Sequence, residues 1–277
     1  MNTVLSRPRA VARRLRGQPA SDGAGVRLTR VIGTAQLSYL DPFLMLDEFG
    51  SDRPGDYLAG FPSHPHRGFE TVTYMLDGRM RHKDNHGNEG LLTPGSVQWM
   101  TAGRGIVHSE MPEQEEGLMR GFQLWVNLPA RDKMGAPGYQ EFDAARIPAV
   151  EPAPGVRVKV IAGSADGVAG PVQQPATEPL YLDVSLLAGA VFEQPIPPGH
   201  NAFAYVYEGE LEEGAKGELL VFGEGDGVSV TGKADASRMI LVAGKPLGEP
   251  VARYGPFVMN TQAEIMQAVQ DFQAGRF

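Results

Sequence analysis

Short runs of β-branched and aromatic residues follow one another along most of the chain, and clusters of Gly, Pro, Asn and Asp separate them. From Val26 onward these runs include ETVTYML, VQWMT, GFQLWVNL, YLDVSLL, NAFAYVYE, ELLVF and RMILVAG. Many short strands at close spacing are typical of a β-sandwich or a β-barrel. The turns between them explain the 35 Gly and 22 Pro among 277 residues. We therefore predict an all-β protein.

The C-terminus is the one stretch with a convincing helical pattern. Thr261 and Glu264 have the T-x-x-E spacing of a capping box, and Gly275 supplies a stop. The apolar face is expected to comprise Ile265, Met266, Val269 and Phe272. Such an amphipathic helix is expected to dock across the β-structure, because it cannot stand alone.

An internal repeat indicates two similar β-domains. The segment TYMLDG at 73–78 resembles AYVYEG at 204–209, an offset of 131. The pair Leu91-Leu92 before Pro94-Gly95 resembles Val221-Phe222 before Gly225 at an offset of 130. We expect a first domain over 1–130, a Pro-, Ala- and Gly-rich linker over 131–154, and a second domain with the terminal helix over 155–277.

Composition excludes several functions. Without cysteine the chain has no disulfides, thiolate zinc sites or cysteine nucleophiles, so any metal must be held by His, Asp or Glu. A net charge of −8 argues against direct nucleic-acid binding. No uncharged apolar run reaches the ~18 residues of a membrane span. The chain's length allows two domains, each with a sizeable core.

The first residues are basic. Five arginines precede the first acidic residue, Asp22; they are Arg7, Arg9, Arg13, Arg14 and Arg16. This composition is also that of a mitochondrial transit peptide. A secretory signal is excluded, because the segment has no apolar core. We favour an opening strand, TVLSRPRAV at 3–11, followed by a basic loop, and hence a cytoplasmic protein.

Five of the six histidines lie between residues 64 and 108. His64 and His66 in FPSHPHRGFET, and His108 and Glu110 in GIVHSEMP, are each separated by one residue. On a strand, residues i and i+2 point to the same side about 6.6–7 Å apart, so each pair can reach one metal. Glu70 has the same parity as His64 and His66. Such ligands suit Fe(II), Mn, Ni, Co or Cu(II) rather than magnesium.

Two histidines are interpreted differently. His82 and His86 lie in RHKDNHGNEG, where Lys, Asp, Asn and Gly describe a solvated hairpin turn. We therefore expect both side chains to be exposed rather than part of a site.

Several motifs together resemble the pirin family of the cupin superfamily. They are GFPSHPHRGFETVTYMLDG, PGSVQWMTAGRGIVHSEMP, GFQLWVNLP, LDPFLMLDEF and GPFVMNTQAEI. The resemblance implies a bicupin, with two jelly-roll β-sandwich domains facing each other and one mononuclear iron in the first. It implies metal ligands at His64, His66, His108 and Glu110.

The resemblance also bears on Glu70 and on the second domain. Most metal-binding cupins take a Glu ligand from the position of Glu70, whereas the pirin pattern uses Glu110, which makes Glu70 a residue expected to orient an imidazole. In the second domain Pro195 and Pro197 stand where His64 and His66 stand in the first, at the offset of 131. We expect that domain to be metal-free, and to be structural or to wall a cavity facing the first domain.

Bacterial pirins are similar to quercetin 2,3-dioxygenases, which open a flavonol ring with O₂ and release CO. The resemblance therefore implies a flavonol-like substrate, with Glu110 as metal ligand and proton acceptor in turn. Gly103 and Gly105 would let a flat ligand approach closely. Residues proposed to line the pocket or support the site are Phe69, Trp99, Met100 and Arg67. Another enolisable small molecule is an alternative substrate.

A different class of function is also open. Eukaryotic pirins are described as redox-sensing iron proteins that regulate a protein partner, such as a transcription factor or a metabolic enzyme. This alternative requires an exposed charged patch near the metal. The candidates for such a patch are Arg67, Arg79, Lys83 and Arg104.

Overall fold

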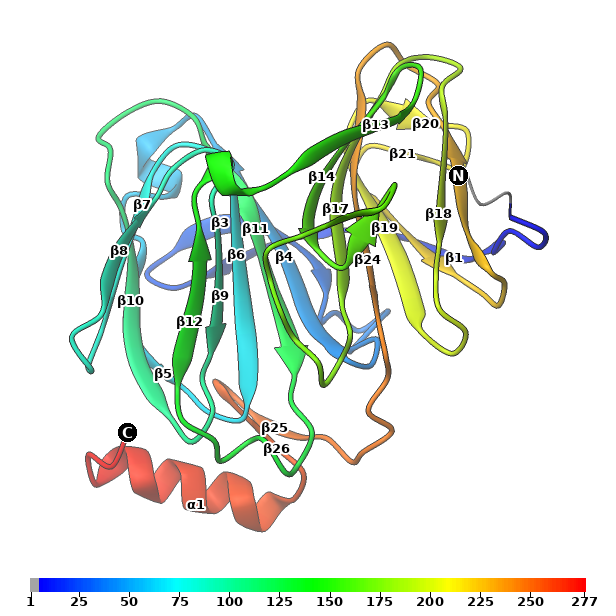
Figure 1. Ribbon diagram of the computed structural model, residues 1–277. Coiled ribbons are helices and arrows are strands. Elements are labelled where there is room, and N and C mark those ends of the chain that lie inside the picture. The colour runs from blue at the N-terminus through cyan, green and yellow to red at the C-terminus, as the bar shows by residue number, and fades with distance from the viewer. Residues whose placement is uncertain (1–4) are drawn as a thin grey trace. The chain divides into compact units, whose positions relative to one another are not determined.

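The computed structural model describes residues 5–277 as short strands with one α-helix near the C-terminus (Figure 1). The contacts divide the chain into two compact units. The N-terminal unit consists of Gln18–Ala144 and Leu247–Phe277. The C-terminal unit consists of Ala145–Pro246 and the segment that ends at Gly17.

The N-terminal unit contains two layered sheets. The larger has the order β12-β9-β6-β11-β4-β3-β2 and the smaller the order β5-β10-β7-β8. The strands are β2 (Gln18–Asp22), β3 (Val26–Ile32), β4 (Phe43–Ser51), β5 (Phe61–His66), β6 (Phe69–Asp77), β7 (Met80–Asp84), β8 (Glu89–Leu92), β9 (Val97–Thr101), β10 (Ile106–Pro112), β11 (Met119–Asn127) and β12 (Gly138–Phe142). The unit also contains a hairpin of β25 (Ala252–Tyr254) and β26 (Phe257–Met259) and a 3₁₀ turn at Pro54–Asp56. A second 3₁₀ turn, Ala144–Arg146, lies where the chain passes from one unit to the other.

The C-terminal unit repeats this plan. Its large sheet has the order β1-β22-β19-β24-β17-β14-β13, and shorter pairs are β18-β23, β20-β21 and β15-β16. The strands are β1 (Val11–Arg16), β13 (Ala149–Ala153), β14 (Val156–Ala162), β15 (Ser164–Ala165), β16 (Val168–Ala169), β17 (Leu180–Leu186), β18 (Val191–Pro195), β19 (Asn201–Glu208), β20 (Glu210–Leu211), β21 (Gly214–Ala215), β22 (Glu218–Phe222), β23 (Gly227–Thr231) and β24 (Ser237–Gly244). Its apolar core includes Val158, Leu182, Phe192, Leu220 and Leu241.

The two large sheets match strand for strand, which confirms the first half of the sequence repeat. TYMLDG lies in and just after β6, AYVYEG in and just after β19, and both strands are central. The second half of the repeat was wrong. Tyr74 pairs with Val97 of β9, and Tyr205 pairs with Leu219 of β22. Val97 therefore corresponds to Leu219, an offset of 122 rather than 130. The hairpin between these strands is shorter in the C-terminal unit.

The unit boundaries differ from those expected, because the terminal segments are exchanged. β1 pairs along β22 and supplies the edge strand of the C-terminal unit's sheet, while residues 247–277 belong to the N-terminal unit. The basic stretch that was expected to be a loop is this strand. Residues 3 and 4 of the expected opening strand lie outside the described residues. The expected linker, 131–154, contains β12 and β13, which pair with β9 and β14.

The C-terminal helix α1 (Gln262–Gln273) has the expected capping box: Thr261 Oγ1 accepts from Glu264 N, and the Glu264 carboxylate accepts from Thr261 N. α1 packs on β25 and β26. Its buried residues are Ile265 and Ala268, whereas Met266 is 64% exposed and was wrongly placed on the apolar face. In the part of the chain that the structure describes, no helix combines the length and apolarity of a membrane span.

Candidate metal centre

Three histidines converge on neighbouring strands of the small sheet. His64 and His66 lie on β5, and His108 lies opposite His64 on β10. One ligand nitrogen from each ring lies within 4.8 Å of the other two. Ring centroids are 4.7 Å apart for His64–His66, 4.4 Å for His64–His108 and 5.0 Å for His66–His108. The alternation of side chains along a strand, which motivated the prediction, brings the three rings together.

The surroundings keep two of these imidazoles neutral. Burial lowers the pKa of His108 to about 4 and lowers that of His66 well below its ordinary value. Both ring nitrogens of His108 are buried and lack a hydrogen-bond partner. His64 Nδ1 lies 2.8 Å from Pro62 O, a bond that leaves Nε2 as the free acceptor nitrogen. Neutral, unpartnered imidazole nitrogens are what a divalent transition metal requires, so this group fits one.

Aromatic side chains pack beside the histidines. The Phe69 ring centroid is 5.1 Å from that of His66, and the Trp125 centroid is 5.2 Å from it. Phe69 and Trp125 also contact each other and belong to a small apolar cluster with Val258. Phe69 was expected to line the site, whereas Trp125 was not singled out. This apolar wall limits water around His66.

Glu110 lies two residues beyond His108, on the same side of β10. Its carboxylate accepts from Thr73 Oγ1 at 3.0 Å and from Gln123 Nε2 at 3.1 and 2.9 Å. The side chain is 1% exposed. Glu110 lies outside the group of atoms within 4.8 Å of one another, which comprises the three histidines alone. Thr73 and Gln123 therefore determine where this carboxylate points.

A row of polar side chains crosses the inner face of the large sheet beneath Glu110. Directly paired residues on neighbouring strands form this row, namely Glu141, Gln98, Thr73, Gln123, Asp47 and Arg30. The row is tied at its far end, where Arg30 forms two bonds to Asp47 at 2.9 and 2.8 Å. We call it the polar row. A polar row inside a sandwich is costly unless its groups are satisfied, which favours a functional explanation.

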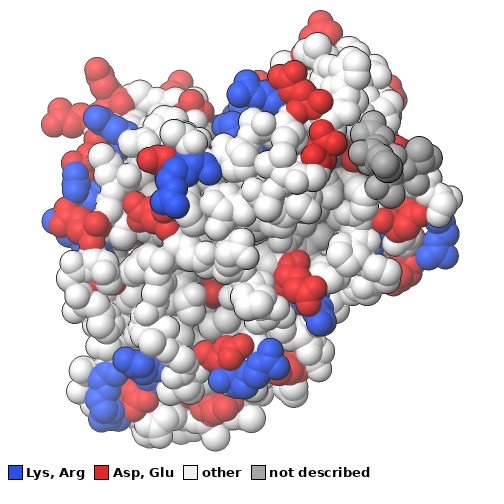
Figure 2. Space-filling model, viewed as in Figure 1, with Lys and Arg blue, Asp and Glu red and all other residues white. Residues whose placement is uncertain are grey.

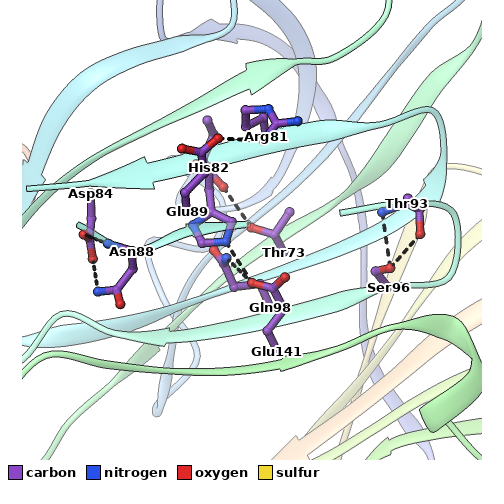
Figure 3. Close-up of polar contacts among 11 residues, drawn as sticks. Thr73, Arg81, His82, Asp84, Asn88, Glu89, Thr93, Ser96, Gln98 and Glu141 are labelled. Atoms are coloured by element: carbon purple, nitrogen blue, oxygen red, sulfur yellow. Dashed lines mark hydrogen bonds and ion pairs between the residues drawn. The ribbon is translucent and has the colours of Figure 1, made fainter. Parts of the chain in front are cut away.

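His82 joins the polar row and was missed. It faces Glu110 across β7 and β10, is 2% exposed, and its Nε2 lies 2.8 Å from Glu141 Oε2. Gln98 donates to the same oxygen at 3.1 Å, and Figure 3 shows these three side chains pointing toward one another. The expectation that His82 is exposed was wrong, whereas His86 is exposed. The available signal was alternation, since buried Met80 and His82 flank the less buried Arg81.

The turn between β5 and β6 is held by charged side chains from elsewhere in the unit. Lys133 is 1% exposed, and its Nζ donates to Gly68 O at 2.7 Å, Asn127 Oδ1 at 2.6 Å and Val258 O at 3.0 Å. Arg67 donates to Asp271 at 2.7 Å. Gly68 has a φ of +89°, and a Cβ there would lie 2.0 Å from Val258 O, so only glycine fits. The turn that follows His66 is therefore tightly fixed.

Glu70 lies on β6, directly after Phe69. It alternates with Phe69 on β6 and so points to the other face, where its Oε1 accepts from Thr101 Oγ1 at 2.7 Å. That Glu70 orients an imidazole stays a prediction. Trp99 also points to that face, because it pairs with Val72, whereas Met100 pairs with Thr71 and points to the histidine side.

The two glycines expected to admit a ligand are filled by other parts of the chain. A Cβ at Gly105 would lie 2.7 Å from the Phe277 ring, and one at Gly103 would lie 2.4 Å from Gly135 O. Arg67 is buried and lies 4.3 Å from the Phe277 ring centroid. It therefore does not contribute to an exposed patch.

The surface charges are mixed. Arg79, Lys83 and Arg104 are exposed. Lys83 forms an ion pair with Glu89 at 3.2 Å. Basic and acidic side chains are interspersed on the face shown in Figure 2. The expected basic patch is thus reduced by the burial of Arg67 and by this pairing.

The corresponding region of the C-terminal unit carries different residues. Pro195 ends β18 and Pro197 lies in the following loop, and neither side chain can ligate a metal. His200, directly before β19, is the histidine of this unit. That this unit carries no metal stays a prediction.

Two β-sandwich units of the same topology, one with a histidine group on neighbouring strands, define a two-domain cupin protein. A family model described as Pirin matches residues 25–126, and one described as Pirin C-terminal cupin domain matches residues 181–277. The chain belongs to the pirin family, which confirms both the resemblance and the all-β bicupin fold.

Individual proteins agree. The chain is 58% identical to a "Pirin-like protein" of Caulobacter vibrioides, covering 97% of this chain and 99% of that protein. It is 55% identical to a "Putative quercetin 2,3-dioxygenase" of Pseudomonas aeruginosa, covering 98% and 99%. A crystal structure of quercetin 2,3-dioxygenase from Acinetobacter baumannii is similar, with a TM-score of 0.90, 33% identity and 98% of each chain covered.

Proposed function

We propose that the protein is a metal-dependent dioxygenase of the quercetin 2,3-dioxygenase type, which opens a flavonol ring with O₂ and releases CO. The observation that carries this proposal is the group of three converging histidines with a buried, oriented carboxylate two residues beyond His108. The similarity to a quercetin 2,3-dioxygenase structure supports the choice of substrate class. Homologues named for that activity support it as well.

His64, His66 and His108 would hold the metal, which we propose to be one Fe(II), with Mn, Ni, Co and Cu as alternatives. Glu110 is proposed as the fourth ligand. When bound, the metal offers open coordination positions for substrate and O₂, and its charge lowers the pKa of a nearby hydroxyl. The burial that keeps His66 and His108 neutral leaves their nitrogens available over a wide pH range.

Glu110 is also proposed to accept the proton of the flavonol 3-hydroxyl. Thr73 and Gln123 hold its carboxylate in one orientation, so little reorganisation is needed when the proton arrives. Phe69 and Trp125 exclude water beside His66 and present an apolar surface suited to a flat aromatic substrate. His82 and Glu141 lie across from Glu110 and continue the polar row.

The test begins with protein loaded anaerobically with Fe(II), and separately with Mn, Ni, Co and Cu. Oxygen and quercetin are then added, the loss of flavonol absorbance is followed, and CO is measured. We expect turnover with at least one metal and none above background for His64→Ala. The matched control is His86→Ala, which removes an exposed histidine outside the group.

Metal content separates the ligand assignments. We expect Glu110→Gln to lower bound metal and Glu70→Gln to leave it unchanged. The reverse result would show that Glu70 is the ligand. If wild-type protein of full metal content turned over no flavonol, the dioxygenase proposal would be rejected.

A further inference from the structure

The histidine group of the N-terminal unit is reached from the side of β5. This strand is an edge of the small sheet, whose order is β5-β10-β7-β8. His64 is partly exposed, whereas His66 and His108 are buried. On this side the large sheet continues beyond β11 through β4 and β3. The side chains gathered there are Trp125, Met45, Asp47, Arg30 and Arg253, which we call the β5-side group.

Arg253 is held at a defined place in the β5-side group. It lies on β25, and its guanidinium carbon is 4.8 Å from the centre of the Trp125 ring. The centre of the same ring is 5.2 Å from that of His66. Because Trp125 contacts both side chains, the guanidinium lies one aromatic ring away from His66. A flat aromatic molecule with one end at the histidine group can therefore reach Arg253 with its other end.

Arg253 is the cation of the β5-side group for which the described residues supply no oxygen acceptor. Arg30 binds both carboxylates nearby, with bonds of 2.9 and 2.8 Å to Asp47 and one of 2.8 Å to Asp22. Among residues 5–277 no ion pair joins Arg253 to a carboxylate. Its side-chain hydrogen bond there, from Nη2 to Met45 Sδ at 4.0 Å, ends on a weak acceptor.

The electrostatic surroundings of Arg253 favour an added anion. Burial and the neighbouring charge of Arg30 lower the pKa of the Arg253 guanidinium, against the opposing effect of Asp47 and Asp22. The guanidinium remains charged at neutral pH, because its ordinary pKa is far above 7. A cation beside another cation, with its N–H donors unused, attracts a negatively charged ligand.

A ligand also has access to Arg253. The residue is exposed, although Ala252 before it and Trp125 beneath it are buried. A guanidinium presents its donors in a planar fork that matches a carboxylate. Hydrogen bonds between two charged groups are roughly twice as strong as those between neutral groups. Stacking on Trp125 holds the fork in place before a ligand arrives.

From the position of Arg253 beside the histidine group and its lack of an oxygen partner, we propose that it binds a negatively charged oxygen at the end of the substrate remote from the metal. This inference rests on the function proposed above and narrows its substrate class to flat aromatic molecules that carry an acidic group, such as a carboxylate, besides the enolisable hydroxyl. Arg253 is then a specificity-determining residue.

The test measures binding in the absence of turnover. Full-length protein loaded with Fe(II) is kept anaerobic and titrated by calorimetry with 3-hydroxyflavones that carry a carboxylate at the 3′ or the 4′ position. The methyl ester of each acid is an uncharged probe of similar shape. We expect at least one acid to bind about tenfold more tightly than its ester, because only the acid forms charged hydrogen bonds with Arg253.

Variants assign this preference to Arg253. Arg253→Gln should lower the ratio of the two affinities from about tenfold to about one. Arg253→Lys keeps the charge but loses the planar fork, so it should retain part of the preference. The matched control is Arg157→Gln, which changes an exposed arginine of the C-terminal unit and should keep the full preference. If Arg253→Gln does not fold, wild type and Arg253→Lys still decide.

Three results would overturn the proposal. They are no binding of either acid to wild type, equal binding of each acid and its ester, and an unchanged preference in Arg253→Gln. Oxygen is admitted in a separate experiment, in which the loss of 3-hydroxyflavone absorbance measures the dioxygenase. Turnover without a preference for acids would reject the role of Arg253 alone, whereas an Arg253-dependent preference without turnover would reject the dioxygenase alone.

Discussion

Lys133 provides the sharpest test of how the metal-site turn is held. Its ammonium group bonds three segments that are distant in sequence, at Gly68, Asn127 and Val258. Lys133→Met keeps the length and apolar stem of the side chain and removes all three bonds. The acceptors at Gly68 and Val258 are backbone carbonyls, so the change acts directly on the turn that follows His66.

Two opposing contributions determine how much Lys133→Met changes the free energy of unfolding. Three hydrogen bonds from a charged group contribute roughly 1.5–3 kcal/mol each. Burial of the Lys133 ammonium lowers its pKa from 10.5 to about 8. At neutral pH this cost of burying the charge offsets about 3 kcal/mol of the stabilisation from the hydrogen bonds. We expect Lys133→Met to lower the free energy of unfolding by about 3 kcal/mol at pH 7, and to weaken metal binding about tenfold through the loosened turn.

The stability difference between wild type and Lys133→Met is expected to increase with pH. Between about pH 8 and 10.5 the folded protein releases the Lys133 proton while the unfolded chain keeps it. The unfolded state then binds more protons, so stability rises with pH in this window. Wild type should therefore gain about 3 kcal/mol relative to Lys133→Met across the window, and the two should be separated by a constant amount below it.

Urea unfolding at several pH values measures these differences, and metal titration measures affinity. Lys216→Met is the matched control, because Lys216 is exposed and its replacement should change stability by less than about 0.5 kcal/mol. If Lys133→Met were as stable as that control at pH 7, or if the gap did not change above pH 8, the account of Lys133 would be refuted.

Three further changes test other parts of the N-terminal unit. Gln123→Leu removes a donor from both oxygens of buried Glu110 and should cost about 2 kcal/mol, with weaker metal binding; unchanged urea midpoint and metal content would contradict it. Thr261→Ala removes the cap of α1 and should cost about 1 kcal/mol in urea unfolding, whereas no change would show that the cap is not stabilising. Gly68→Ala would force a Cβ against Val258 O at positive φ, so we expect loss of folded protein or of metal, measured by circular dichroism and metal analysis; a native-like, metal-replete variant would disprove the steric argument.

Local periodicity predicted what depends on neighbours in sequence. The i, i+2 spacing placed His64 and His66 on one side of β5, and the T-x-x-E spacing located the start of α1. It failed where composition and environment disagree. His82 lies among residues typical of a solvated turn, yet pairing of β7 with β10 and β8 places it inside the unit. The alternation at Met80, Arg81 and His82 was the one local signal, and it does not say which strands flank β7.

The support of the site could not be predicted for the same reason. Lys133 meets Val258 across 125 residues of sequence, and Phe277 fills the space above Gly105. The helical pattern assigned Met266 to the apolar face of α1, but it does not specify which side of the helix packs on the β25–β26 hairpin. The hairpin covers Ala268 instead of Met266. Such contacts depend on the completed fold, not on the sequence around each residue.

The exchange of terminal segments sets an order for synthesis. A chain leaving the ribosome has all of the C-terminal unit once Pro246 has emerged, but the N-terminal unit still lacks residues 247–277. The three histidines are made early, whereas Val258 and Asp271, which bind Lys133 and Arg67, are made after the whole C-terminal unit. The histidine group should therefore acquire its final rigidity only after residues 247–277 have been made, and a nascent chain stopped before them should hold metal more loosely than one that contains them.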